Sequence, residues 1–222
     1  MPLNVSNISF GSMDNQPERK TKAAALCGSV LGLSCAVAGI SKGRGNKIPV
    51  QNFKAYIKSL QNLEFDEKDV ILLASSSISG GLLGGVMTDG KNAKAKVKEG
   101  VVQLVGNYIF PSLFVGGAIK LNKFLFSKYN VKNTKFLKIL FGGAGLVSGV
   151  ISGNKVSKII NKYLFKEKTD RPLTINDWLL QGDNVCLVAS MSGSGSKIAK
   201  AASKIIPPLH IMPGYFVGIK NS

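Results

Sequence analysis

Hydrophobic and charged residues occupy separate stretches of this chain, and the uncharged stretches are as long as membrane spans. Four runs contain no Asp, Glu, Lys or Arg: 23–40, 70–88, 100–119 and 139–154. An amphipathic helix of a soluble protein carries charge along its wet face. An uncharged run of about 18 residues or more is instead typical of a helix that crosses a membrane. The last run reaches this length if its flanking lysines extend toward the headgroups.

Turn residues and acidic residues mark where these helices begin and end. Glycines at 43 and 45 close the first helix, and the acidic cluster at 64–69 precedes the second. Acidic side chains at a helix start cap free N–H groups and suit the helix dipole. Pro111 lies inside the third helix and predicts a kink there. The four helices are expected at 22–40, 70–87, 96–121 and 134–162.

Shorter elements accompany these helices. In 50–63, apolar residues recur every three or four positions between lysines, which predicts an amphipathic surface helix. A second surface helix is expected at 174–180, with Trp178 at the membrane interface. The prolines at 207, 208 and 213 predict an irregular tail over 205–222. The expected fold is therefore an all-α, polytopic membrane helix bundle with about four spanning helices and amphipathic surface helices.

The order of motifs suggests two degenerate halves, 23–120 and 121–222, after a polar tail at 1–22. Val70–Ser77 and Val185–Ser192 share the pattern V-x-L-x-A-S-x-S. Duplicated halves are common in membrane transporters, although helices rich in small residues also resemble one another by composition. Two further alternatives stay open at this point: residues 1–38 could be a cleaved secretory signal, and the runs could be core helices of a large soluble protein.

Small residues recur at every fourth position in the first, second and fourth expected spans. This spacing places them on one helix face, where two backbones can approach closely inside lipid. The residues concerned are Gly28, Gly32, Gly80, Gly81, Gly84, Gly85, Gly145, Gly149 and Gly153. We expect these glycines to pack helices within one chain. The functional alternative is that they mediate self-association into a homo-oligomer or line a pore.

Polar residues also align within the third span. Gln103, Asn107 and Pro111 are four residues apart and share one face of the helix. Amides inside a membrane need hydrogen-bond partners, and Ser75 and Ser79 on the second helix are candidates. These residues could form an interhelical lock. They could also line a polar path for a small solute or ion.

The charge narrows the choice of partner. The chain has 29 Lys and Arg against 12 Asp and Glu, a net charge of +17, yet it is 45% hydrophobic. That apolarity excludes a disordered chain. Lysine greatly outnumbers arginine. Arginine is the residue better suited to phosphates and bases, because its guanidinium group can form two parallel hydrogen bonds to them. Lysines at helix ends therefore favour anionic lipid headgroups over nucleic acid, and the expected location is a bacterial cytoplasmic membrane.

Catalytic signatures are missing from the sequence. The single histidine, His210, lies among prolines and has no obvious partner, and no C-x-x-C pair occurs. We therefore expect no enzyme, no metal and no cofactor. The first hypothesis is a non-enzymatic membrane component that packs or self-associates through glycine faces. The alternatives are a small transporter or channel with a path along Gln103 and Asn107, and a basic peripheral protein on anionic membranes or nucleic acid.

Overall fold

The chain folds entirely into helices over the part that the computed structural model describes, residues 17–45, 63, 65–129, 134–166, 181–192 and 197–221. No strand occurs in these ranges. The helices are α1 Arg19–Gly43, α3 Glu67–Thr88, α4 Ala93–Gln103, α5 Phe110–Lys128, α6 Lys135–Tyr163, α8 Gly182–Ser192, α9 Lys197–Leu209 and α10 Ile211–Gly218. The surface helices expected at 50–63 and 174–180 fall outside the described residues, apart from Leu63.

The acidic cluster before α3 acts as a helix start, as the sequence predicts. The Asp66 carboxylate accepts hydrogen bonds from the backbone N–H groups of Lys68 and Asp69, both at 3.0 Å. The Asp69 carboxylate in turn accepts from the Asp66 N–H at 3.0 Å. This reciprocal capping box satisfies N–H groups that have no partner within the helix, so the carboxylates are explained by helix initiation.

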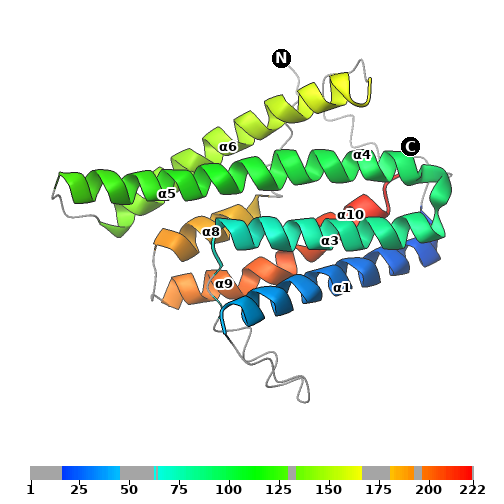
Figure 1. Cartoon of the computed structure of the whole chain (residues 1–222), viewed down its shortest axis with the longest axis horizontal. Coiled ribbons are helices and arrows are strands. Elements are labelled where there is room, and N and C mark those ends of the chain that lie inside the picture. Colours follow the sequence, from blue (N-terminus) through cyan, green and yellow to red (C-terminus); the bar gives the residue numbers. More distant parts are fainter. Residues whose placement is uncertain are drawn as a thin grey trace, which may run out of the picture.

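The third predicted helix is one long rod with a π-helical segment inside it (Figure 1). After a short 3-10 turn at Gly90–Asn92, α4 leads into the π-helix η3, Leu104–Ile109, and then into α5. The N–H of Phe110 reaches the carbonyl of Val105. Pro111 cannot donate to the preceding turn and its ring crowds that turn, and the wider π-helical turn comes directly before it. The predicted irregularity thus takes the form of a π-helix.

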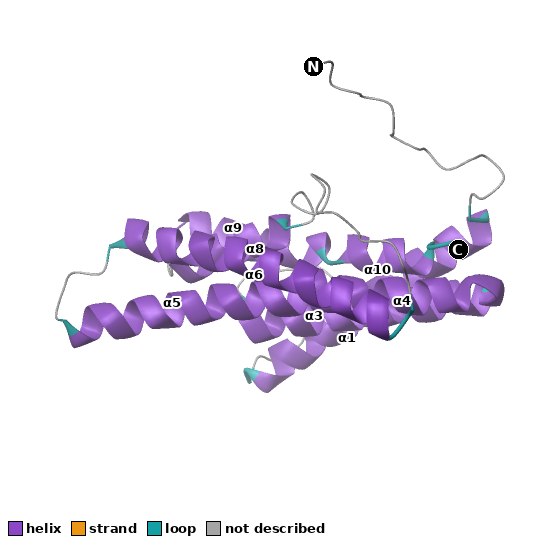
Figure 2. Ribbon diagram, turned by 90° about the horizontal axis from the view of Figure 1, so that it is seen from above, coloured by secondary structure: helices purple, strands orange, loops and turns teal. Residues whose placement is uncertain are grey.

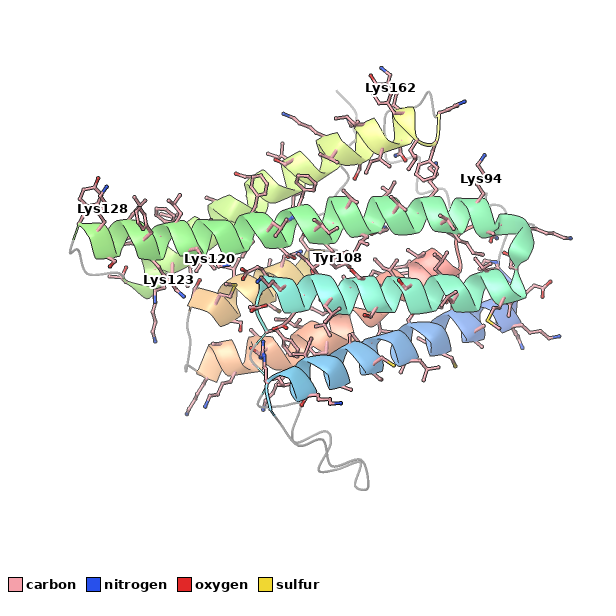
Figure 3. All side chains as sticks on the ribbon, in the orientation of Figure 1. Lys94, Tyr108, Lys120, Lys123, Lys128 and Lys162 are labelled. Carbon is pink, nitrogen blue, oxygen red and sulfur yellow. The ribbon has the colours of Figure 1, made fainter. Side chains whose placement is uncertain are left out.

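The helices run along one common direction and define two ends of the bundle (Figures 1 and 2). At one end, Lys96 lies 3.0 Å from Asp89, where α3 leads into α4. At the other end, Lys120 of α5 pairs with Glu67 at the start of α3. We call these the Lys96 end and the Lys120 end. Lys94 and Lys128 mark the two tips of the rod, and Tyr108 lies between them (Figure 3).

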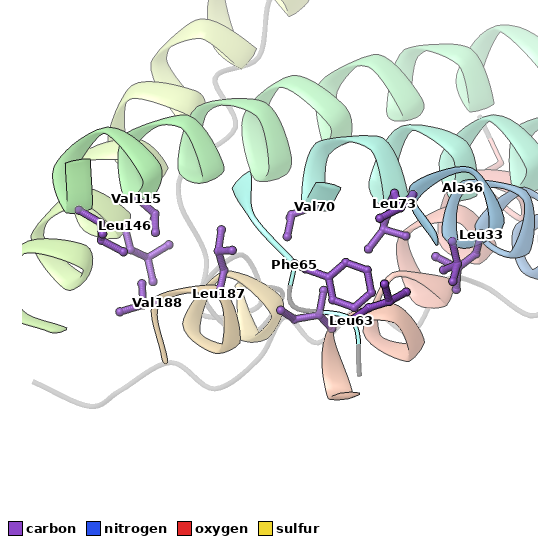
Figure 4. Close-up of a cluster of buried hydrophobic side chains, with 14 of the residues drawn as sticks. Leu33, Ala36, Leu63, Phe65, Val70, Leu73, Val115, Leu146, Leu187 and Val188 are labelled. Carbon is purple, nitrogen blue, oxygen red and sulfur yellow. The ribbon is translucent and has the colours of Figure 1, made fainter. Parts of the chain in front are cut away.

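The apolar interior consists of two clusters, one toward each end. The larger cluster lies toward the Lys120 end and includes Phe65, Leu73, Val115, Leu187 and Ile206 (Figure 4). The smaller cluster lies toward the Lys96 end and is formed by Ala74, Ile78, Tyr108 and Val217, with Leu82 and Leu104 packed against it. The helices pass from one cluster to the other, so the level between the clusters is near the middle of the bundle.

Polarity is distributed as in a membrane protein rather than a soluble one. Large apolar side chains face outward along the long helices, among them Leu31 at 67% exposure, Leu83 at 65% and Phe136 at 70%. Meanwhile serines, amides, an aspartate and a histidine are buried. Monomeric soluble proteins rarely expose apolar surface on this scale. Four helices are long and apolar enough to cross a membrane: Arg19–Gly43, Glu67–Thr88, Gly90–Lys128 and Lys135–Tyr163.

One expectation about the second half is wrong. The tail at 205–222 was expected to be irregular, but α9 continues to Leu209 and α10 covers Ile211–Gly218. Pro213 is tolerated because it lies in the first turn of α10, where its missing N–H would have no helical partner. Pro207 and Pro208 lie inside the last turn of α9. The division into two halves at residue 120, which lies inside α5, stays a prediction. In addition, α10 packs on α1 and α3, so the two sequence halves are interleaved in space.

Candidate functional site

A layer of polar side chains separates the two apolar clusters. On α3, Ser77 is fully buried and lies about halfway between Glu67 and Asp89. On α5, buried Ser112 comes between Tyr108 of one cluster and Val115 of the other. Buried polar groups are costly unless they find partners.

An Asp–His pair stands at the centre of the layer. Asp183 is 2% exposed and lies in the first turn of α8, and His210 is 0% exposed and lies between α9 and α10. Oδ2 of Asp183 is 3.2 Å from Nε2 of His210. The positive end of the α8 dipole favours a carboxylate at this position. The expectation that His210 lacks a partner is wrong, because the partner lies in a different helix.

The break between α9 and α10 places His210 at the level of Ser77. The Ser77 hydroxyl donates to the His210 carbonyl at 2.5 Å, and Nδ1 of the ring is 2.8 Å from the Ile206 carbonyl. The Tyr108 ring in the π-helix lies 5.4 Å from the imidazole ring. Helix breaks and π-turns both cluster at functional sites in proteins. Here they meet at one buried histidine.

Asn184 connects the pair to the long rod. Its side-chain N–H groups lie 2.8 Å from the Gln181 side-chain oxygen and 3.3 Å from the Asn107 carbonyl. Its oxygen accepts a hydrogen bond from Ser112 at 3.1 Å. The Asn107 carbonyl belongs to η3, so the α8 start is held against the π-helical segment of the rod. The pair is thus part of a network across three helical segments.

Gln103 and Asn107 extend this network toward the Lys96 end. The Asn107 amide donates to the Gln103 oxygen at 2.7 Å, and the Gln103 amide donates to Glu99 at 2.9 Å. Glu99 also faces Lys220, at 3.7 Å. The two amides therefore form a ladder along their own helix, which differs from the interhelical lock considered from the sequence. The ladder joins the Lys96 end to the middle of the bundle.

The serines expected to partner these amides do not do so. Ser75 donates to the Ile71 carbonyl of its own helix at 2.7 Å, and Ser79 is exposed. The reason is the helix period: residues two apart are about 200° apart around the axis. Because Ser77 faces His210, Ser75 and Ser79 face away from it. Ser75 therefore does not bond Gln103 or Asn107, and a polar path along these two amides stays a prediction.

An apolar layer closes the network on the other side. Leu187, one turn along α8 from Asp183, is fully buried, and so is Ile206, one turn before His210. Beyond them, toward the Lys120 end, the hydroxyls of Ser190 and Ser203 lie 2.7 Å apart between α8 and α9. The pair is thus separated from the next polar contact by one layer of apolar side chains.

The glycines predicted to pack helices lie at close approaches between neighbouring helices. On α1 and α3, a methyl group on Gly28 would meet the Gly80 carbonyl, one on Gly32 would meet that of Ser76, and one on Gly84 would meet that of Ala24. Close approach of this kind is available only to residues without a Cβ.

The remaining predicted glycines face the segments that carry the site. Gly81 and Gly85 lie against Gly214 and Gly218 of α10, which fixes the helix that begins after His210. On α6, Gly153 lies against Gly106 in the π-helix, Gly149 against Pro111, and Gly145 against Phe114. The faces are therefore used within the chain.

Sequence reasoning missed Gln181, Asp183, Asn184 and His210 as one group. One signal was present: Val185 aligns with Val70 in the shared pattern, and each is the fourth residue of its helix. The polar residues just before Val185 therefore correspond to the helix start at Glu67–Asp69. That alignment places Asp183 in a first turn. It gives no indication that the turn lies inside the bundle beside a histidine.

Together, the four candidate spans and the inverted polarity define a multi-pass membrane protein with an all-α fold. Comparison of the chain with protein-family models, with curated proteins and with solved structures gives no match.

Proposed function

We propose that this protein moves small monovalent cations, protons included, across a membrane along an internal polar path. The observation that carries the proposal is a partly buried hydrogen-bonded series from Glu99 through Gln103, Asn107 and Asn184, which ends at the fully enclosed pair of Asp183 and His210. Ionisable residues inside membrane proteins usually mark ion pathways or proton relays. The two acidic residues and the amide and carbonyl oxygens along the chain favour a cation.

The arrangement supports a gated path rather than an open pore. The amide ladder leads from the Lys96 end to the Asp–His pair, and Leu187 and Ile206 close the way onward. Both residues belong to α8 and α9, which are short helices beside four long ones. Many transporters bind their ion at a broken helix near the membrane midplane and move one bundle of helices against another. A shift of α8 and α9 against α5 is the corresponding motion here.

The test is cation flux in proteoliposomes, with dyes for K⁺, Na⁺ and H⁺. Wild-type protein is expected to carry at least one of these ions. The double variant Gln103→Leu with Asn107→Leu should lose flux while remaining folded, because apolar side chains replace the ladder. The matched control is Ser75→Ala with Ser79→Ala, which changes two polar residues of α3 that face away from His210. Absence of flux for all three ions, or equal flux in both double variants, would refute the proposal.

A second candidate function is that of a membrane component that self-associates without transport. The close glycine approaches favour tight helix packing in lipid. The nine predicted glycines are engaged within the chain, whereas Gly117 and Gly143 have open space around them. Self-association would therefore use faces such as these. Crosslinking in vesicles with Gly117→Leu and Gly143→Leu separates the two candidates, because loss of oligomers with retained flux assigns self-association a secondary role.

Lipid headgroups are the partners proposed for the lysine-rich helix ends. Lys197, Lys200 and Lys204 are exposed along one side of α9, and further lysines fringe both tips of the rod. Such clusters suit the anionic headgroups found in bacterial cytoplasmic membranes, which is the proposed location. Faster reconstitution into vesicles that contain phosphatidylglycerol than into neutral vesicles would support this role. Equal rates in the two vesicle types would contradict it.

A further inference from the structure

The hydrogen-bond directions around His210 determine where its protons are. Nδ1 lies 2.8 Å from the Ile206 carbonyl oxygen, and a carbonyl only accepts hydrogen bonds. Nδ1 therefore carries a proton. In a neutral ring with this tautomer, Nε2 has a lone pair and no hydrogen. That lone pair would face Oδ2 of Asp183 at 3.2 Å.

Two acceptors at this distance repel each other unless a proton lies between them. An ionised Asp183 beside a neutral His210 would also leave a net negative charge inside the bundle, with both side chains at most 2% exposed. Burying an uncompensated charge costs several kcal/mol or more. One proton removes both problems. It gives either an imidazolium beside a carboxylate or an imidazole beside a carboxylic acid, and both are neutral overall.

Three polar atoms at this place have no hydrogen bond within the described part of the chain. They are Nε2 of His210, Oδ2 of Asp183 and Nε2 of Gln181, whose residue is 1% exposed. Nε2 and Oδ2 face each other at 3.2 Å. Buried polar groups of native proteins are nearly always satisfied. Nε2 and Oδ2 therefore lack the one proton that would join them.

We infer that Asp183 and His210 together bind one transported proton at the middle of the bundle. The proton passes between them when the bond from hydrogen to Oδ2 breaks and the bond from hydrogen to Nε2 forms, with no change in oxidation state. Its release leaves the pair with one negative charge, which the next proton neutralises. The role in transport rests on the proposed function, whereas binding of the proton does not.

Neighbouring groups make the pair a distinct binding site. The other titratable side chains described around it are Tyr108 of the π-helix and Cys186 of α8, both within electrostatic reach of Asp183. Ser77, from α3, meets only the His210 carbonyl. Asn184 connects the pair to the ladder that begins at Glu99. Asn184 meets the ladder at the backbone carbonyl of Asn107, so the polar side chains of the ladder reach the pair from the Lys96 end.

The first experiment measures binding without transport. The chain has one histidine, so ¹⁵N-histidine labelling in nanodiscs yields a single ring. We expect a protonated Nδ1 in the wild type, and an Nε2 resonance that shifts in Asp183→Asn and stays in place in Glu18→Gln, which removes an exposed carboxylate. An unprotonated Nδ1 in the wild type overturns the inference and requires no variant. An unmoved Nε2 resonance in folded Asp183→Asn overturns it as well.

The second experiment measures transport, using a pH-sensitive dye inside proteoliposomes. Asp183→Asn and His210→Gln are each expected to lower proton flux by at least about tenfold, as for loss of a proton-transfer group. The Glu18→Gln control should retain it. If the Nε2 resonance shifts in Asp183→Asn but neither the wild type nor any variant shows cation flux, the binding site is upheld and the proposed function is refuted. Proton flux unchanged in both variants would refute the proton-carrying role and leave cation transport standing.

Discussion

The contact between α1 and α3 allows a quantitative test of the packing, through a single methyl group. In Gly80→Ala, the new Cβ would overlap the Gly28 carbonyl. A carbon atom normally lies about 3.5–4.0 Å from its non-bonded neighbours. The helices must therefore separate by roughly 1 Å or more at this point, because a backbone carbonyl cannot rotate away as a side chain can.

Separation at Gly80 weakens the adjacent approaches too, since Gly32 meets Ser76 and Gly84 meets Ala24 one turn to either side. Each backbone approach of this kind contributes about 0.5–1 kcal/mol, with dispersion added. The total loss is about 2–4 kcal/mol. Alanine is the better helix former by about 1 kcal/mol. The net expectation is a free energy of unfolding lowered by about 1–3 kcal/mol, which is the usual cost of overpacking.

The assay is unfolding in mixed micelles of dodecylmaltoside and SDS, followed by circular dichroism. The matched control is Gly117→Ala, because Gly117 is also inside a long helix but has nothing within 4 Å of an added Cβ. At Gly117 the higher helix propensity of alanine is not offset by a steric clash, so the free energy of unfolding should rise by about 0.5–1 kcal/mol. The two variants should therefore move in opposite directions. If Gly80→Ala matches or exceeds the wild type in stability, the close approach of α1 and α3 is refuted.

Three further predictions follow from caps, charge and the apolar layer. Asp66→Ala should lower stability by about 1 kcal/mol, while Asp66→Asn, which can still cap, should stay near the wild type; equal losses would argue against the cap. The hydrogen bond from Asn92 lowers the pKa of Asp89 below its ordinary value of 3.8, and the hydrogen bond and positive charge of Lys96 lower it further. The stability that Asp89 contributes is therefore present above about pH 4 and is lost as pH falls through the lowered pKa. In an acid titration followed by circular dichroism, Asp89→Asn should lose less stability than the wild type as the pH falls. The same loss in both proteins would contradict this. Leu187→Ala should cost about 2–5 kcal/mol through the cavity it leaves, and in proteoliposomes it should raise proton leak; a leak no higher than wild type would show that Leu187 is not the barrier.

The long helices could be predicted from the sequence because their signals are local. Uncharged runs bounded by charged residues give the spans, and Asp66 caps the helix that follows it, as the acidic cluster indicates. Pro111 marks the irregular turn, although the sequence does not distinguish a kink from a π-helix. These features depend on neighbours within one or two turns. That is why the predicted helix bounds lie close to the observed ones.

The site could not be predicted because its parts are joined only by the fold. His210 lies among prolines, which by local rules indicate an irregular segment, and a charged Asp183 counts against a buried position. Because α8 begins inside the bundle, Asp183 and His210 lie side by side there, and each provides the other with a polar partner. The same limit applies to Ser77, whose partner is the His210 carbonyl. Its neighbours Ser75 and Ser79 look equally suitable in the sequence but face elsewhere.

The short helices α8, α9 and α10 have a consequence for how the protein is assembled. An 11-residue helix such as α8 is about 16 Å long, about half the thickness of the hydrocarbon core. It also begins with a carboxylate, so it is a poor substrate for insertion by the translocon. These helices emerge from the ribosome after the four long ones. We expect the four spans to be inserted first, and the α8–α10 segment to dock late, with α10 against the face of α3 that carries Gly81 and Gly85. Biogenesis would then end with closure of the Asp–His site, so a chain stalled before α8 should already be membrane-integrated but lack the proton site.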